Sequence, residues 1–365
     1  MSHRRQRLAF VLCLSFLATP LAAQDYRIAF VPTAPGARPG IWLANPDGSE
    51  LRVLPAERTA MLRPGSWSPD GRTILYYSFG PDDSKLKALP VHFPLYATSV
   101  DGKSGRRVVD FTVLSFGWAP DSRTIFVISG FEDETPYSTA EWFPKTALYV
   151  VDVQSGKRVR VTEPGSVQGA SWAPDGSRLV YSATVPGDPM PDLFVVNRDG
   201  TGMRRMVSLP TADLNPRWSP NGDTVYFAST GRGSPDERAG FQVVDVRSGA
   251  VTRVAEMGSW PSMQWSPDGK RLLADVGQPT GHVLVSQDGK TRTPIGEIGL
   301  DAQFSPDAKQ LYFRMQSRDG GIWAVALSGG GRRKVVDGNF FGISPVLESS
   351  VLSAIAALPS PTNRR

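Results

Sequence analysis

Histidine is the side chain that most readily acts as a general base or metal ligand near neutral pH, and this chain has few histidines. Beyond residue 23 there are only His92 and His282, which fall in different repeats of the sequence. The sequence also has no GxSxG nucleophile motif, because the nearest match, "GISPV" from Gly342, lacks the second glycine. The sequence therefore predicts no catalytic residue, no metal site and no bound cofactor.

Five aspartates at equivalent places of a repeated phrase are the other group with possible chemistry, as calcium ligands: Asp70, Asp121, Asp175, Asp268 and Asp307. No DxDxDG loop, the pattern that gathers oxygens around calcium, is present. Aspartate in a turn commonly accepts a hydrogen bond from the backbone that follows it. We therefore expect these carboxylates to shape turns.

The repeated phrase itself marks the end of one strand and the start of the next. It occurs six times, as "SWSPDG", "GWAPDS", "SWAPDG", "RWSPNG", "QWSPDG" and "QFSPDA". Its aromatic residues lie 51, 54, 46, 47 and 39 residues apart, a period that suits one propeller blade: Trp67, Trp118, Trp172, Trp218, Trp265 and Phe304. We expect these rings to be core wedges between blades, with sugar stacking as the alternative. Ser122 and Ala308 replace the turn glycine, which predicts that this corner does not require positive φ.

A second repeat, a hairpin with a glycine at its corner, lies between the copies of the first, and it occurs seven times. One unit is then four antiparallel strands, which is the composition of a propeller blade. The segment "YRIAFVP" from Tyr26 lacks a preceding strand, and "NFFGISP" from Asn339 lacks a following blade. Pairing Phe340–Ser344 with Tyr26–Val31 completes a seven-bladed, all-β propeller, and six or eight blades are the alternatives.

The chain ends differ from the repeats. Three arginines, an uncharged run over 8–18 and the pair Ala22 and Ala23 predict a signal peptide over 1–23. The only cysteine, Cys13, lies in it, and so do three of the formal net charges of +5. The remaining charge is too small for a nucleic-acid-binding protein, and no later run is long and apolar enough for a transmembrane segment. The sequence thus predicts a propeller over 24–345, a C-terminal tail over 346–365 and a periplasmic or secreted location.

The WSPDG phrase, followed by a strand and by a hairpin such as "LYVVDVQSG" from Leu148, resembles the repeat of TolB-type propellers, also called WD40-like or PD40 repeats. The resemblance implies a propeller fold and a protein partner in the cell envelope, such as a lipoprotein. The same repeat is also found in the non-catalytic propellers of prolyl-oligopeptidase-type proteases and in some pectin-degrading lyases.

Two long loops are expected on one rim of the propeller, over 79–94 and 130–144, in adjacent blades. Long loops in a compact domain are usually functional or disordered, and the aromatic residues of these two favour recognition over plain padding. The candidate partner-binding residues are Phe93, Tyr137, Trp142 and Phe143 in or beside the loops, and Arg63, Gln168, Asn215, Trp260, Ser262 and Asp301 near the starts of the inner strands. For Trp260, a buried packing role is an equal alternative.

These observations predict an exported, non-catalytic, monomeric propeller that binds a protein or peptide-like partner and no nucleic acid. Three alternatives stay open. The first is a polysaccharide lyase or hydrolase with its site at the channel mouth, and the second is a glycan or small-molecule sensor. The third is a stand-alone propeller related to prolyl-oligopeptidase-type peptidases.

Overall fold

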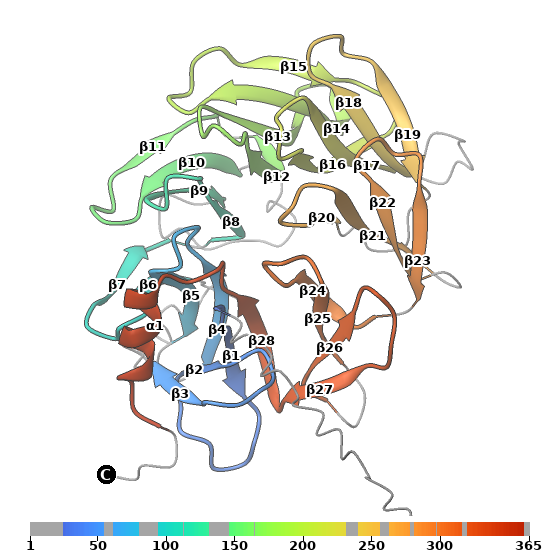
Figure 1. The fold of residues 1–365 in the computed structure, drawn as a ribbon. Coiled ribbons are helices and arrows are strands. Elements are labelled where there is room, and N and C mark those ends of the chain that lie inside the picture. The colour runs from blue at the N-terminus through green and yellow to red at the C-terminus, as the bar shows by residue number, and fades with distance from the viewer. Residues whose placement is uncertain are drawn as a thin grey trace, which may run out of the picture.

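The protein folds into seven four-stranded antiparallel sheets arranged around an axis, as the computed structural model in Figure 1 shows. The structure describes residues 25–54, 61–79, 94–111, 113–130, 146–163, 165–230, 240–255, 263–277, 281–296, 298–315 and 320–360. Each sheet is one blade, and we number the blades in chain order. In Figure 1 the strands nearest the axis include β4, β8, β12, β20, β24 and β28. The predicted all-β, seven-bladed propeller is confirmed.

The first three blades are formed by the N-terminal half of the chain, except for one strand of blade one that comes from the C-terminal part. Blade one consists of β28 (Gly338–Ile343), β1 (Ile28–Pro32), β2 (Ile41–Ala44) and β3 (Arg52–Leu54). Blade two consists of β4 (Met61–Trp67), β5 (Thr73–Phe79), β6 (Leu95–Ser99) and β7 (Gly105–Val109). Blade three consists of β8 (Ser115–Trp118), β9 (Thr124–Ser129), β10 (Ala147–Asp152) and β11 (Arg158–Arg160).

The other four blades follow the same order from the axis outward. Blade four consists of β12 (Ser166–Trp172), β13 (Arg178–Val185), β14 (Asp188–Asn197) and β15 (Arg204–Val207). Blade five consists of β16 (Ala212–Trp218), β17 (Thr224–Thr230), β18 (Gly240–Asp245) and β19 (Val251–Ala255). Blade six consists of β20 (Met263–Trp265), β21 (Arg271–Gly277), β22 (Gly281–Ser286) and β23 (Arg292–Gly296). Blade seven consists of β24 (Leu300–Phe304), β25 (Gln310–Arg314), β26 (Ile322–Ala326) and β27 (Arg333–Val336).

The two ends of the chain close the ring within blade one. Strand β28 pairs with β1 in antiparallel register, with Ile343 opposite Ile28 and Gly342 opposite Ala29. The backbone N–H of Ser344 also donates to the carbonyl of Arg27 at 2.9 Å. This is the pairing that the sequence predicts, and it leaves seven blades rather than six or eight.

Three of the repeated tryptophans donate a hydrogen bond to the preceding blade. The indole Nε1 of Trp118 donates to the carbonyl of Ser66 at 3.3 Å, and that of Trp172 donates to the carbonyl of Gly117 at 3.1 Å. Trp67 makes the equivalent bond to Gly342 of β28, at 3.2 Å. Because these rings also lie in the cores between blades, their predicted role as wedges is confirmed.

The aspartates of the repeated phrase form turns, as expected. The carboxylate of Asp70 accepts the backbone N–H of Arg72 at 3.0 Å, and Asp268 accepts that of Lys270 at 3.1 Å. The prediction about the next corner was wrong, because Ser122 and Ala308 have φ of 56° and 55°, close to the 69° of Gly71. The turn imposes the left-handed conformation on whichever residue stands there.

The C-terminal segment contains a short helix, α1 (Ser349–Ala356), which the predicted tail did not anticipate. Val351 and Ile355 of α1 are buried with residues of blades one and two, among them Leu54 and Tyr96. Figure 1 shows α1 on the outside of the ring at this seam. Within the described residues, no helix has the length and apolar character needed to cross a membrane.

Candidate functional site on the propeller axis

The innermost strands contain β-bulges, which turn side chains away from the regular alternation of a strand. The pairing register shifts between Val167 and Gly169 in β12, between Leu214 and Arg217 in β16, and between Leu300 and Gln303 in β24. At two of these bulges a residue other than glycine has positive φ, 51° at Asn215 and 58° at Asp301. Such strained backbone is common at functional sites.

A cavity of about 580 Å³ lies among the inner strands β8, β12 and β16 and the turns that follow β4, β8 and β12. Its polar lining includes Ser115, Gln168, Ser171, Asn215 and Arg217. Its apolar lining consists mainly of aromatic rings and turn prolines, namely Pro69, Phe116, Trp118, Pro120, Phe126, Trp172 and Pro174. This mixture is typical of a site that holds a ligand by shape and orients it through a few polar groups.

Arg217 is the one charged residue among the described residues that line the cavity. Its Nη1 donates to the carbonyl of Pro216 at 3.0 Å and to that of Ala170, on the inner strand of blade four, at 3.4 Å. Burial lowers the pKa of the Arg217 guanidinium below its usual value. The cation is therefore held between two blades and is partly removed from water.

Two of the predicted partner-binding residues meet in this cavity. Gln168 of β12 and Asn215 of β16 both line it, and the Asn215 side chain lies against Gly169. Asp301 lies elsewhere, on β24, where its carboxylate pairs with Arg314 at 2.9 Å. The backbone of Arg63 belongs to β4. Phe93, Tyr137, Trp142, Phe143, Trp260 and Ser262 lie outside the described residues, as does the predicted signal peptide, and the partner-binding role of the whole set stays a prediction.

Sequence reasoning missed Arg217 as a site residue. It stands directly before the aromatic anchor of its repeat, where the other copies have Ser66, Gly117, Ser171, Gln264 and Gln303. The lone cation at a position that is otherwise neutral was the available signal.

Asp213 was also missed as an unusual residue. It lies five positions before Trp218, whereas the residues five positions before Trp118 and Trp172 are valines, Val113 and Val167. Asp213 is fully buried, and its Oδ2 has no hydrogen-bond partner among the residues that the structure describes. Burial, with a contribution from the charge of Asp192, raises the pKa of the Asp213 carboxyl to about 7, although a hydrogen bond from Ser229 opposes this.

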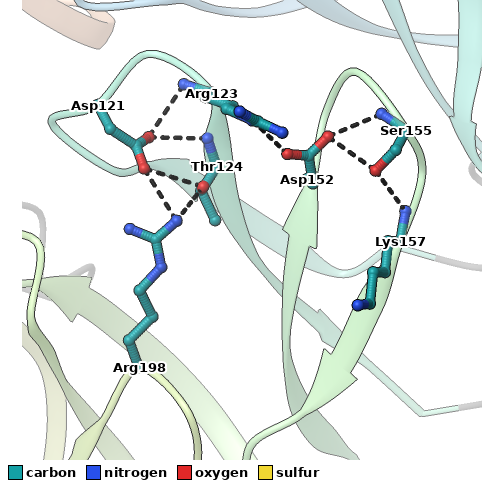
Figure 2. Close-up of polar contacts among 7 residues, drawn as sticks. All are labelled: Asp121, Arg123, Thr124, Asp152, Ser155, Lys157 and Arg198. Carbon is teal, nitrogen blue, oxygen red and sulfur yellow. Dashed lines mark hydrogen bonds and ion pairs between the residues drawn. The ribbon is translucent and has the colours of Figure 1, made fainter.

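A polar cluster elsewhere on the ring has a structural role. Figure 2 shows Arg198, which follows β14, reaching Asp121 and Thr124 of blade three. The distance from Arg198 Nη2 to Asp121 Oδ2 is 2.9 Å. Partial burial acts to raise the pKa of Asp121, but hydrogen bonds from Arg123, Thr124 and Arg198 hold it below its usual value. The cluster clamps blade four to blade three.

Among the described residues, no group of three or more histidine, cysteine, aspartate and glutamate side chains could hold a metal ion. The fold and the axial cavity therefore define the molecule as a seven-bladed β-propeller with a polar site among its inner strands. The family model of the TolB beta propeller domain (PD40) matches residues 87–346, and the chain belongs to this family.

Individual relatives are distant. The chain is 27% identical over 162 residues to the uncharacterized protein Atu1656 of Agrobacterium fabrum, a match that covers 42% of this chain and 51% of that protein. The chain thus spans about half the length of this curated relative.

Two solved structures have a similar fold. TolB from Acinetobacter baumannii has a TM-score of 0.54 at 19% identity, with 88% of this chain and 83% of that chain covered. An oligogalacturonate lyase in complex with manganese has a TM-score of 0.59 at 16% identity, with 86% and 84% covered. At these identities the likeness extends to the fold alone, and the same fold occurs in a TolB protein and in a lyase.

Proposed function

We propose that this chain is an exported, non-catalytic propeller that binds a protein or peptide-like partner in the cell envelope. The observation that carries the proposal is the axial cavity, in which Gln168, Asn215 and Arg217 come together from two neighbouring inner strands. Amide and guanidinium groups bind the carbonyl and carboxylate oxygens that every peptide offers. The cavity volume lies in the range that takes a small ligand or a short segment of a larger one.

Membership of the TolB propeller family supports a partner in the cell envelope, such as a lipoprotein. The pattern of the first 23 residues supports export, to the periplasm or beyond. We expect the propeller to act as a monomer, because the ring closes its own sheet edges within one chain.

Binding, rather than catalysis, is assigned on the chemistry of the cavity wall. General acid–base catalysis needs a titratable group within hydrogen-bond reach of the reacting atoms. The described lining residues are amides, hydroxyls, aromatic rings, prolines, small residues and one arginine. These groups can orient a ligand by hydrogen bonds and stacking.

The proposal is tested by affinity capture from an envelope extract on the immobilised mature chain. We expect wild type to retain a defined protein, and Gln168→Ala to retain it at least fivefold less, because the amide that faces the partner is removed. Gln154→Ala is the matched control, since Gln154 is exposed and lies beside a different cavity, between blades two and three.

Equal capture by Gln168→Ala and wild type would remove the cavity as the binding site. If the purified protein depolymerises oligogalacturonate and retains a metal after dialysis, the protein is a lyase and the proposed binding function is wrong. A variant with the 130–144 loop shortened to a Gly-Ser link tests the predicted contribution of that loop in the same assay.

A further inference from the structure

The guanidinium of Arg217 is only partly used by the protein. Its Nη1 group makes both of the hydrogen bonds that Arg217 donates to described residues, to the carbonyls of Pro216 and Ala170. The other donors, Nε–H and the two N–H bonds of Nη2, have no acceptor among the described residues. Nε and Nη2 lie along one edge of the planar group, and this edge presents two parallel donors.

This edge has the geometry that a carboxylate fits. Arginine binds a carboxylate through two parallel N–H···O bonds, and such charge-assisted pairs are stronger than hydrogen bonds between neutral groups. No described carboxylate lies within ion-pair distance of Arg217, and the polar side chains that share its cavity, such as Gln168 and Ser171, are uncharged. The partly buried cation is thus left without a counter-charge, and a partly desolvated charge is costly until an anion pairs with it.

The surrounding structure holds this guanidinium in one orientation. One of its carbonyl acceptors is on the inner strand of blade four and the other is on that of blade five. The bulge between Leu214 and Arg217, with Asn215 at φ 51°, sets the direction in which the side chain leaves the strand. A donor fixed before binding loses little freedom when the ligand arrives.

We propose that Arg217 anchors a carboxylate of the partner, and that this carboxylate is the C-terminal group of a peptide chain. The inference rests on the proposed function and adds to it the chemical group that is recognised. The neighbouring amide of Gln168 can bind the last peptide groups of such a chain, and Asn215 shapes the wall beside it. Trp118 and Trp172 offer apolar surface to its side chains, and the volume of about 580 Å³ suits a chain end rather than a folded element.

The test uses two pools of N-acetylated hexapeptides, randomised over all residues except aspartate and glutamate. One pool ends in a free carboxylate and the other in an amide. Retention of each pool on the immobilised mature protein is measured by mass spectrometry. We expect wild type to retain the carboxylate pool at least tenfold more than the amide pool, and Arg217→Gln to lose this preference.

Two further variants make the result specific. Arg217→Lys keeps the positive charge but lacks the two-donor edge, so it should retain the carboxylate pool several-fold less than wild type. Arg247→Gln removes an exposed arginine from the outer hairpin of the same blade and should bind as wild type does. Unchanged melting temperatures of the variants show that any loss is one of recognition.

The outcomes separate this inference from the function on which it rests. Equal retention of both pools by wild type would overturn the carboxylate anchor and leave peptide binding in place. Full binding by Arg217→Lys would overturn the two-donor contact. Retention of neither pool, together with Arg217-dependent binding of short galacturonate oligomers, would overturn both the peptide terminus and the proposed function.

Discussion

At the scale of single residues, Asp213 is the most unusual side chain of the propeller. It lies on the inner strand β16 and is 0% exposed, close enough to Asp192, itself 1% exposed, for the charge of Asp192 to act on it. Asp192 forms an ion pair with Arg205, whereas Asp213 has only hydroxyl and backbone donors, such as Ser229. Burial without a counter-charge is the main reason that the pKa of Asp213 rises to about 7.

This pKa predicts a pH dependence of stability. The unfolded chain releases the Asp213 proton near pH 4 and the folded chain releases it near pH 7, so the folded state binds more protons between these values. The contribution of Asp213 to the free energy of unfolding therefore falls as the pH rises through this window, by up to roughly 4 kcal/mol. We expect Asp213→Asn, which cannot ionise, to lose this dependence and to exceed wild type in stability at pH 8.

The measurement is urea unfolding of both proteins at pH 4.5 and at pH 8. Carboxylates with lowered pKa values, such as Asp152 at about 2, change stability in the opposite direction but are common to both proteins. The change in the difference between the two proteins from pH 4.5 to pH 8 therefore reports the ionisation of Asp213 together with its effect on Asp192. A difference that does not change between the two pH values would contradict a pKa near 7.

At the scale of elements, the C-terminal segment is bound to the ring at a turn of the repeated phrase. Leu347 is 3% exposed, and a Cβ placed on Gly71 would lie 2.3 Å from its Cδ2. At the equivalent corner of blade five, a Cβ on Gly222 would lie 3.7 Å from the nearest atom, in Pro174, which is ordinary contact. The two glycines have similar φ, 69° and 76°, and differ in what surrounds them.

This pair of corners gives a prediction for the C-terminal segment. Gly222→Ala should lower the free energy of unfolding by about 1 kcal/mol. Alanine is disfavoured in the left-handed conformation, but it also reduces the conformational freedom of the unfolded chain, which offsets part of this loss. Gly71→Ala should cost 1–3 kcal/mol more, roughly the penalty of overpacking, because Leu347 must move. In a chain that ends at residue 344, which removes both Leu347 and the neighbouring Pro345, the two substitutions should lower the free energy of unfolding equally. An excess cost of Gly71→Ala that survives the truncation would show that Leu347 is not its cause.

At the scale of the whole molecule, the ring could be predicted from the sequence because residues within each repeat mark where its strands begin and end. Proline and aspartate mark the turns, the aromatic residue marks the inner strand, and unmatched strands at both ends imply the closure between β1 and β28. Helix α1 was missed because its burial comes from contact with blades one and two, which no local pattern encodes. The places of Gln168 and Asn215 near the starts of inner strands could be predicted from the repeat, and their partner-binding role stays a prediction. The orientation of Arg217 could not be predicted, because it depends on a bulge and on the carbonyl of Ala170 in the adjacent blade.

The closure itself carries the last prediction, because the ring is held shut by hydrogen bonds and packing rather than by a covalent link. Ala29 of β1 and Gly342 of β28 stand opposite each other, and a Cβ on Gly342 meets nothing closer than 3.4 Å. The double variant Ala29→Cys with Gly342→Cys should therefore form a disulfide, since directly opposed residues lie near the required separation. Joining residues so far apart in sequence should raise the free energy of unfolding by about 2–4 kcal/mol when oxidised and not when reduced.

The cross-link lies away from β8, β12 and β16, so partner capture should be unchanged. Free thiols that persist in the folded, oxidised protein would show that these two strands are not held side by side.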